Sequence, residues 1–198
     1  MRINDRIPTH VTVSGRRYRI DTDFRNVMRM NEIMRQPDLT DEARDWLALR
    51  CLMRHPPRRR DRQVEALKAL HELLFSSKRG GVDEKKITDI EQDAELIFAA
   101  FLQEYGVNLW RDRLSWFEFT ALLAGIAEGT RYSDILTIRA RPMPKPTKWN
   151  GEEREWLAKA KAVHALTMTD DEQAEYYDRS VRSIFDGLLS MAGGKHGG

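Results

Sequence analysis

Two neighbouring segments in the middle of the chain carry apolar side chains nearly all the way round a helix. They are residues 94–102 and residues 114–127, and each contains leucines and aromatic residues. Helices without a polar face are buried by other elements, so these two predict the centre of a mainly α-helical protein. The longest apolar run is far shorter than the roughly 20 residues that a membrane-spanning helix needs. We therefore expect no membrane partner.

The rest of the first 140 residues has the pattern of amphipathic helices and one hairpin. Apolar residues alternate with polar ones around Ser14-Gly15, which predicts a β-hairpin within residues 11–20. Helical spacing predicts four further helices, at about 24–35, 40–52, 61–76 and 133–139. We expect Thr88 or Asp89 to cap the helix that contains residues 94–102, Gly106 to end that helix, and Ser133 to cap the last of the four.

A proline-rich segment separates this part from two more amphipathic helices. We expect Asn150, with Glu153, to cap a helix to about residue 166, and Thr169 to begin a second helix to about residue 189. The predicted fold is mainly α: a helical bundle with a small N-terminal β-hairpin and a C-terminal helical pair after a Pro-rich linker. The corresponding regions are 1–141 for hairpin and core, 142–149 for the linker, 150–191 for the pair and 192–198 for a disordered tail.

Apolar side chains form a stripe on each of the two C-terminal helices. These stripes either pair with each other or cover an apolar partner. The candidate partner-binding residues are Trp156, Leu157, Val163, Tyr177, Val181, Phe185 and Leu188.

Charge is distributed unevenly. Residues 1–62 hold fifteen arginines and nine acidic residues, whereas residues 63–138 have a net charge of −5. The two regions either pair within the fold or form a polar surface for partners, and pairing is the simpler interpretation. The cluster Arg58-Arg59-Arg60-Asp61-Arg62 could contact phosphates. It is short, lacks interleaved aromatic residues and is interrupted by Asp61, which favours a solvated loop over nucleic-acid contact.

Sequence motifs for catalysis are missing. No histidine has a second ligand at metal-binding spacing, and no phosphate-binding glycine loop or nucleophile elbow is present. The one cysteine, Cys51, lies on an apolar helix face and is expected to be an inert thiol. The sequence therefore favours a non-catalytic protein without catalytic residues, metal or cofactor. No apolar stretch follows the first residues, so we expect no signal peptide and an intracellular location.

Four segments carry a resemblance to a known family. They are residues 20–25 after the hairpin, residues 91–106, residues 114–126 and residues 135–139, and together they extend over about residues 11–140. The chain resembles the bacteriophage tail assembly chaperones of the phage gp-fifteen type. It differs slightly from them, because the family commonly has paired tryptophans where Trp116-Phe117 stand.

The resemblance implies a function and partners. Such proteins are mostly helical, bind the long tape-measure protein in the host cell cytoplasm, keep it soluble and promote tail-tube assembly. They carry no catalytic residues and are absent from the mature virion. One alternative is a structural tail or head–tail connector component of the virion. Another is a nucleic-acid binder that uses Arg58 to Arg62. The hairpin edge also allows self-association.

Overall fold

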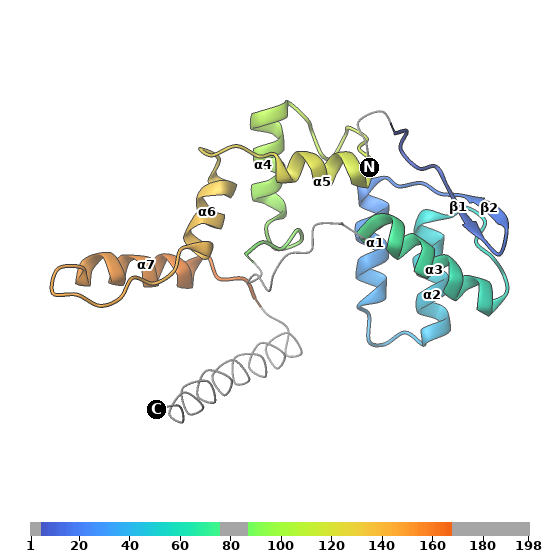
Figure 1. Cartoon of the computed structure of the whole chain (residues 1–198), viewed down its shortest axis with the longest axis horizontal. Helices are drawn as coiled ribbons and strands as arrows, with labels where there is room; N and C mark the ends of the chain where they lie inside the picture. The colour runs from blue at the N-terminus through green and yellow to red at the C-terminus, as the bar shows by residue number, and fades with distance from the viewer. Residues whose placement is uncertain (1–4, 76–86, 168–198) are drawn as a thin grey trace, which may run out of the picture. The chain divides into compact units, whose positions relative to one another are not determined.

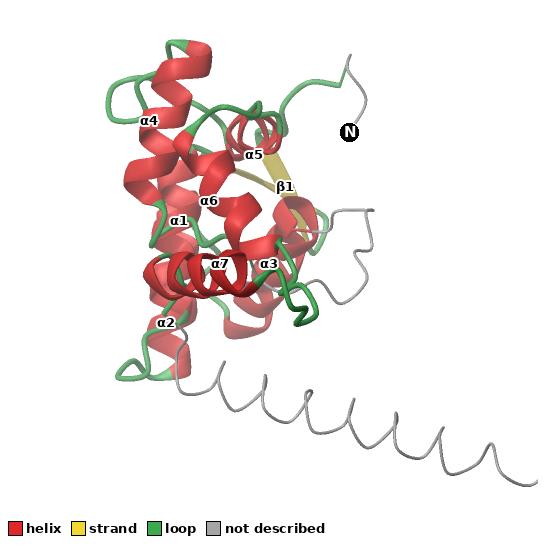
Figure 2. Ribbon diagram, turned by 90° about the vertical axis from the view of Figure 1, so that its left-hand side faces the viewer, coloured by secondary structure: helices red, strands yellow, loops and turns green. Residues whose placement is uncertain are grey.

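The computed structural model describes residues 5–75 and 87–167, and in this part of the chain it is mainly helical (Figures 1 and 2). The predicted fold class is confirmed. The chain divides into two compact units. Unit 1 comprises residues 1–85 and 94–134, and unit 2 comprises residues 86–93 and 135–198, as far as these residues are described. The proline-rich residues 142–149 lie inside unit 2.

Unit 1 begins with the predicted hairpin. Strands β1 (His10–Val13) and β2 (Arg16–Arg19) are antiparallel, with Val11 opposite Tyr18. The turn residues Ser14 and Gly15 both have positive φ, 46° and 75°, as the two-residue turns that suit a twisted hairpin require. Strand β1 packs against α3 (Figure 1). The hairpin thus buries one apolar face on a helix, which an isolated pair of strands needs for stability.

Three amphipathic helices follow, close to the predicted positions. They are α1 (Phe24–Met34), α2 (Asp41–Leu52) and α3 (Arg60–Phe75). The Asp23 side chain accepts a hydrogen bond from the Arg25 backbone N–H, and Thr40 accepts one from Ala43, so each satisfies a backbone donor of the first turn. Helix α2 packs against both α1 and α3.

The two central helices are α4 (Ala94–Tyr105) and α5 (Trp116–Ala124). Gly106, with φ of 65°, ends α4 as predicted. Helix α4 starts at Ala94, later than predicted, because residues 90–93 form turns. The predicted Asp89 does accept hydrogen bonds from the backbone N–H groups of Glu91 and Gln92, but these belong to the turns before the helix. Helix α5 is shorter than predicted at both ends. Ser115 and Glu118 form a capping box at its start.

The core of unit 1 is a set of aromatic rings around Phe119. The Phe119 ring stacks with Phe24 of α1 at 4.6 Å and with Phe101 of α4 at 5.3 Å between centroids. Trp116 lies 5.9 Å from Phe119 and donates its ring N–H to the carbonyl of Leu74 at the end of α3. Rings from α1, α4 and α5 therefore share one buried centre.

Helices α6 (Arg131–Ala140) and α7 (Gly151–Val163) complete the described chain, and the division between the units falls within α6. Two predicted caps are wrong. Thr130, rather than Ser133, accepts the first-turn N–H, from Ser133 itself. Asn150 makes no side-chain cap because its side chain bonds the backbone of Thr147 and Lys145. The predicted helix over 169–189 and the disordered tail over 192–198 lie outside the described residues.

The aromatic core gives a direct test of unit 1. We expect Phe119→Ala to lower the free energy of unfolding by about 3–5 kcal/mol, because the Phe119 ring is 1% exposed and its loss leaves a cavity. Phe117→Ala is the matched control, since Phe117 stands on the same helix and is only partly buried. Urea unfolding followed by circular dichroism measures both. Equal losses in the two variants would contradict the central position of Phe119.

Candidate functional site

Three of the predicted partner-binding residues lie on α7, and the structure separates them. Trp156 is 55% exposed and Val163 is 77% exposed, whereas Leu157 is completely buried. Residues seven apart share a helix face, and the next residue along is turned by about 100°. Leu157 therefore does not share the exposed side of α7 with Trp156 and Val163. The other four, Tyr177, Val181, Phe185 and Leu188, lie outside the described residues.

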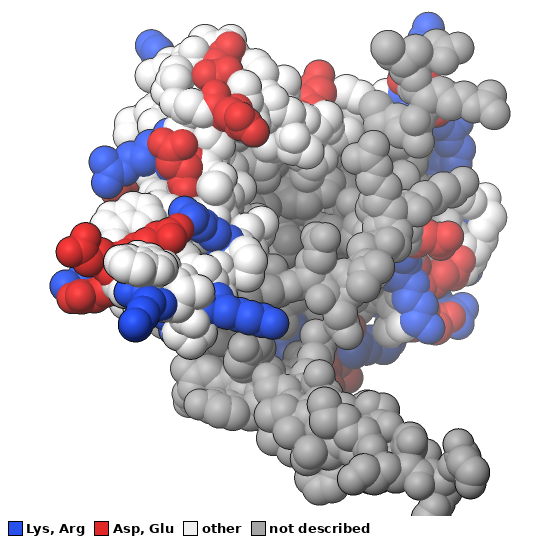
Figure 3. Space-filling model, turned by 60° about the vertical axis from the view of Figure 1, so that its left-hand side comes forward, with Lys and Arg blue, Asp and Glu red and all other residues white. Residues whose placement is uncertain are grey.

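The most exposed apolar side chain of unit 2 among the described residues was missed in the sequence. Trp149, which precedes α7 by two positions, is 92% exposed. Its position after three prolines, outside any helical pattern, was the only available signal. We call Trp149, Trp156 and Val163 the α7 apolar surface. Figure 3, which brings forward the side of Figure 1 where α7 lies, shows acidic, basic and uncharged side chains interspersed there.

A buried ion pair organises unit 2. Asp93 is 1% exposed, and its two carboxylate oxygens accept hydrogen bonds of 2.8 and 2.7 Å from the guanidinium of Arg139 on α6. The Arg139 guanidinium also donates to the backbone carbonyls of Ile87 and His164. The backbone carbonyl of Arg139 accepts a hydrogen bond from the Lys161 side chain of α7. One arginine thus connects residues 87–93, α6 and α7, and holds α7 in place within the unit.

The electrostatics of Asp93 indicate a structural role. Burial acts to raise the pKa of this carboxyl, but the hydrogen bonds from Arg139 and from the Asp89 backbone outweigh burial and lower it. The carboxylate is therefore charged at neutral pH and has its hydrogen-bond acceptors occupied. A group in this state is unsuited to proton transfer near neutral pH.

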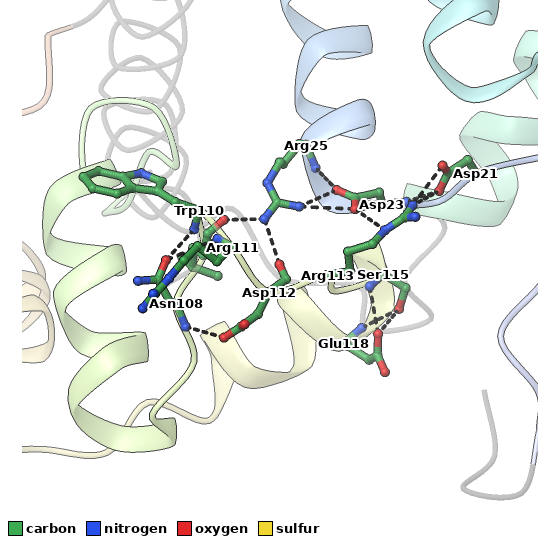
Figure 4. Close-up of polar contacts among 11 residues, drawn as sticks. Asp21, Asp23, Arg25, Asn108, Trp110, Arg111, Asp112, Arg113, Ser115 and Glu118 are labelled. Carbon is green, nitrogen blue, oxygen red and sulfur yellow. Dashed lines mark hydrogen bonds and ion pairs between the residues drawn. The ribbon is translucent and has the colours of Figure 1, made fainter.

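A second ionic cluster, in unit 1, fixes the loop between α4 and α5 (Figure 4). Arg25 bonds the Asp23 carboxylate and donates to the carbonyls of Leu109 and Asp112 at 2.6 and 2.7 Å. The Arg113 guanidinium donates hydrogen bonds to the carboxylates of Asp21 and Asp23. The pKa of Arg113 is raised, mainly by the negative charge of Asp21 and next by the hydrogen bond to Asp23. These donors are engaged within the chain, so this cluster positions a loop rather than presenting a reactive group.

Little in the described residues resembles a reactive centre. Among residues 5–75 and 87–167, no group of three or more His, Cys, Asp or Glu could hold a metal ion. Burial is the main influence on Cys51 and raises the pKa of its thiol, which keeps the thiol in its weakly nucleophilic protonated form. No helix in the same residues is long and apolar enough to cross a membrane.

Comparison with known proteins gives one match. The sequence model of a family described as "Bacteriophage Gp15 protein" matches residues 3–166. The match includes α7 and the α7 apolar surface, beyond the residues that carried the resemblance in the sequence. No curated protein and no solved structure matches the chain.

The buried pair predicts a large effect of a small substitution. We expect Asp93→Asn to lower the free energy of unfolding by about 3–5 kcal/mol, because it leaves the Arg139 guanidinium buried without a counter-charge. Glu153→Gln is the control, since it removes an exposed ion pair with Arg141 in the same unit and should cost less than about 1 kcal/mol. Thermal unfolding measures both. A similar small loss of unfolding free energy in both variants would contradict the role of the Asp93–Arg139 pair in stabilising unit 2.

The same pair predicts a pH dependence. Because the pKa of Asp93 is lower in the folded chain, its stabilisation is present above the unfolded value of about 3.9 and is lost as pH falls through the folded value. The difference in unfolding temperature between wild type and Asp93→Asn should therefore be constant from pH 7 to 5 and shrink below about pH 4. Other carboxyls titrate equally in both proteins. A difference that persists unchanged to pH 3 would contradict the prediction.

Proposed function

The chain belongs to the Bacteriophage Gp15 protein family, and from this premise we propose that it is a non-catalytic protein that serves assembly of the phage virion. In its specific form, the proposal is a tail assembly chaperone. The protein binds the tape-measure protein in the host cell cytoplasm, keeps it soluble and promotes tail-tube assembly. The α7 apolar surface is its client-binding surface.

The observation that carries the proposal is the exposure of this surface. Tryptophan is among the more buried residues on average and is enriched where proteins bind one another, yet Trp149 and Trp156 are both more than half exposed. A helical client offers apolar residues at positions i, i+3, i+4 and i+7, which suits the two exposed apolar side chains that α7 presents seven residues apart, Trp156 and Val163. Leu157 and the Arg139 network hold α7 while that face remains available.

A second candidate is a structural tail or head–tail connector component. The hairpin favours it, since among the described residues β1 and β2 form a sheet with each other only. An open strand edge can pair with another chain, either a second copy or another virion protein. A permanent contact of this kind suits a protein that remains in the particle.

Co-expression with the tape-measure protein of the same phage tests client binding. We expect the double variant Trp156→Ser/Val163→Ser to bind this protein about 10-fold more weakly than wild type, because two exposed anchors are lost. The control is Trp110→Ser, which changes a tryptophan of unit 1 that is more exposed, at 80%, than Trp156. The amount of tape-measure protein that remains soluble and co-purifies is the measurement.

Mass spectrometry of purified particles distinguishes the two candidates. Binding of the tape-measure protein together with absence from particles supports the chaperone. Presence in particles at stoichiometric amounts supports the structural component. Unchanged client binding in the α7 double variant would contradict the assignment of the α7 apolar surface, whatever the particles contain.

A further inference from the structure

Arginines from three elements of unit 1 surround one pocket. Its volume is about 480 Å³, and it lies among β2, α2, the segment after α2 and α3. We call it the arginine pocket. Its basic lining residues are Arg16, Arg50, Arg54, His55, Arg58, Arg59 and Arg62. Among the residues that the structure describes, none with a carboxylate lines it.

Most of these arginines have no counter-ion within the part of the chain that the structure describes. Arg59 pairs with Asp61 at 2.9 Å, and Arg50 donates to the carbonyl of Arg54. For Arg16, Arg54 and Arg58 the structure gives no ion pair, and Arg62 interacts with the Glu65 carboxylate only through charge, without a direct ion pair. The six guanidinium groups repel one another, and only that of Arg59 has an ion-pair partner, so the pocket keeps an excess of positive charge.

The carboxylates near the pocket are already engaged. The Glu65 side chain accepts hydrogen bonds of 2.6 and 2.5 Å from the backbone N–H and hydroxyl of Ser14, and these bonds lower its pKa. Asp45 pairs with Arg60, which does not line the pocket. Because these acids have partners of their own, the described residues leave positive charge in the pocket that an external anion can neutralise.

Two aromatic rings lie in the same lining. The Arg16 guanidinium covers the ring of Tyr18, at 5.4 Å from its centroid, and Trp46 of α2 is 38% exposed. In the sequence, the basic cluster at residues 58–62 has no aromatic residue among its members. The fold brings the exposed Trp46 to it from α2, whereas Tyr18 is buried beneath Arg16, so one aromatic ring is available to a ligand beside the basic cluster.

A second hollow, of about 800 Å³, adjoins the arginine pocket. It shares Arg16, Tyr18, Arg54 and His55 with the first and extends along β2. Arg17 and Arg19 of β2 also line it, and its only carboxylate, Asp21, is already paired with Arg113. The positive surface is therefore elongated, which fits an extended chain of charges better than a single ion.

We propose that the arginine pocket and the adjoining hollow bind single-stranded nucleic acid through its phosphates. Guanidinium groups form two-pronged hydrogen bonds with phosphate as well as with carboxylate, but the exposed ring of Trp46 distinguishes the two ligands. A nucleotide strand brings one charge and one flat base per unit, and bases stack on exposed aromatic side chains in a positive groove. An acidic polypeptide offers carboxylates without a flat group for Trp46. The proposal is independent of client binding by the α7 apolar surface.

The test uses the full-length protein and a fluorescently labelled 20-nucleotide deoxythymidine strand, with binding followed by anisotropy at several salt concentrations. We expect Arg58→Gln/Arg62→Gln to weaken binding at least 10-fold at low salt. It should also reduce the slope of log affinity against log salt by about 1.4, as expected for two lost contacts to a single strand. Arg29→Gln/Arg111→Gln removes the same charge from exposed positions outside both hollows and should change affinity less than twofold.

Three further arms identify the ligand. Trp46→Leu should weaken strand binding several-fold and leave the salt slope unchanged, because stacking releases no counter-ions. Polyglutamate and inorganic phosphate, at matched charge, should displace the strand poorly. Equal weakening by both arginine double variants would overturn the proposal, since it would show binding to overall charge. Displacement by polyglutamate would assign the pocket to an acidic protein segment, and displacement by inorganic phosphate to a small anion.

Discussion

The stacking of Phe119 is the contact on which unit 1 depends. One ring connects three helices, because Phe24 belongs to α1, Phe101 to α4 and Phe119 itself to α5. The neighbouring Trp116 extends this centre to the end of α3 through its hydrogen bond to Leu74. The backbone pairs Asp23 with Ser115, next to these rings, so the start of α1 and the start of α5 are held together. Aromatic packing and backbone pairing thus act at the same place.

Local sequence predicted most of the helices and the hairpin, because their signals are carried by residues close together in the chain. The positive φ angles of Ser14 and Gly15 and the caps at Asp23 and Thr40 are of this kind. The start of α4 was missed for the opposite reason. Asp93 looks like part of an acidic first turn, but it is the partner of Arg139, 46 residues later. A pairing over that separation leaves no periodic signal.

The candidate sites likewise contain some residues with a local sequence signal and others that only the fold brings together. Periodicity identified α7 as amphipathic, but it could not show which apolar residue faces inward, so Leu157 was grouped with Trp156 and Val163. Trp149 stands outside any helix and had no pattern to identify it. The arginine pocket is a tertiary feature, since Arg16, Trp46 and Arg62 come from different elements. From the sequence, only its basic cluster at residues 58–62 could be found.

Arginine has two different roles in this chain, and the number of engaged donors separates them. Arg139 uses its guanidinium on a buried carboxylate and two carbonyls, and Arg25 bonds one carboxylate and two carbonyls. Such side chains have few donors left for a ligand and act as internal connectors. Arginines that line a hollow without a carboxylate partner, such as Arg54 and Arg58, keep their donors available. An excess of arginine therefore marks a binding surface only where the fold leaves these donors unsatisfied.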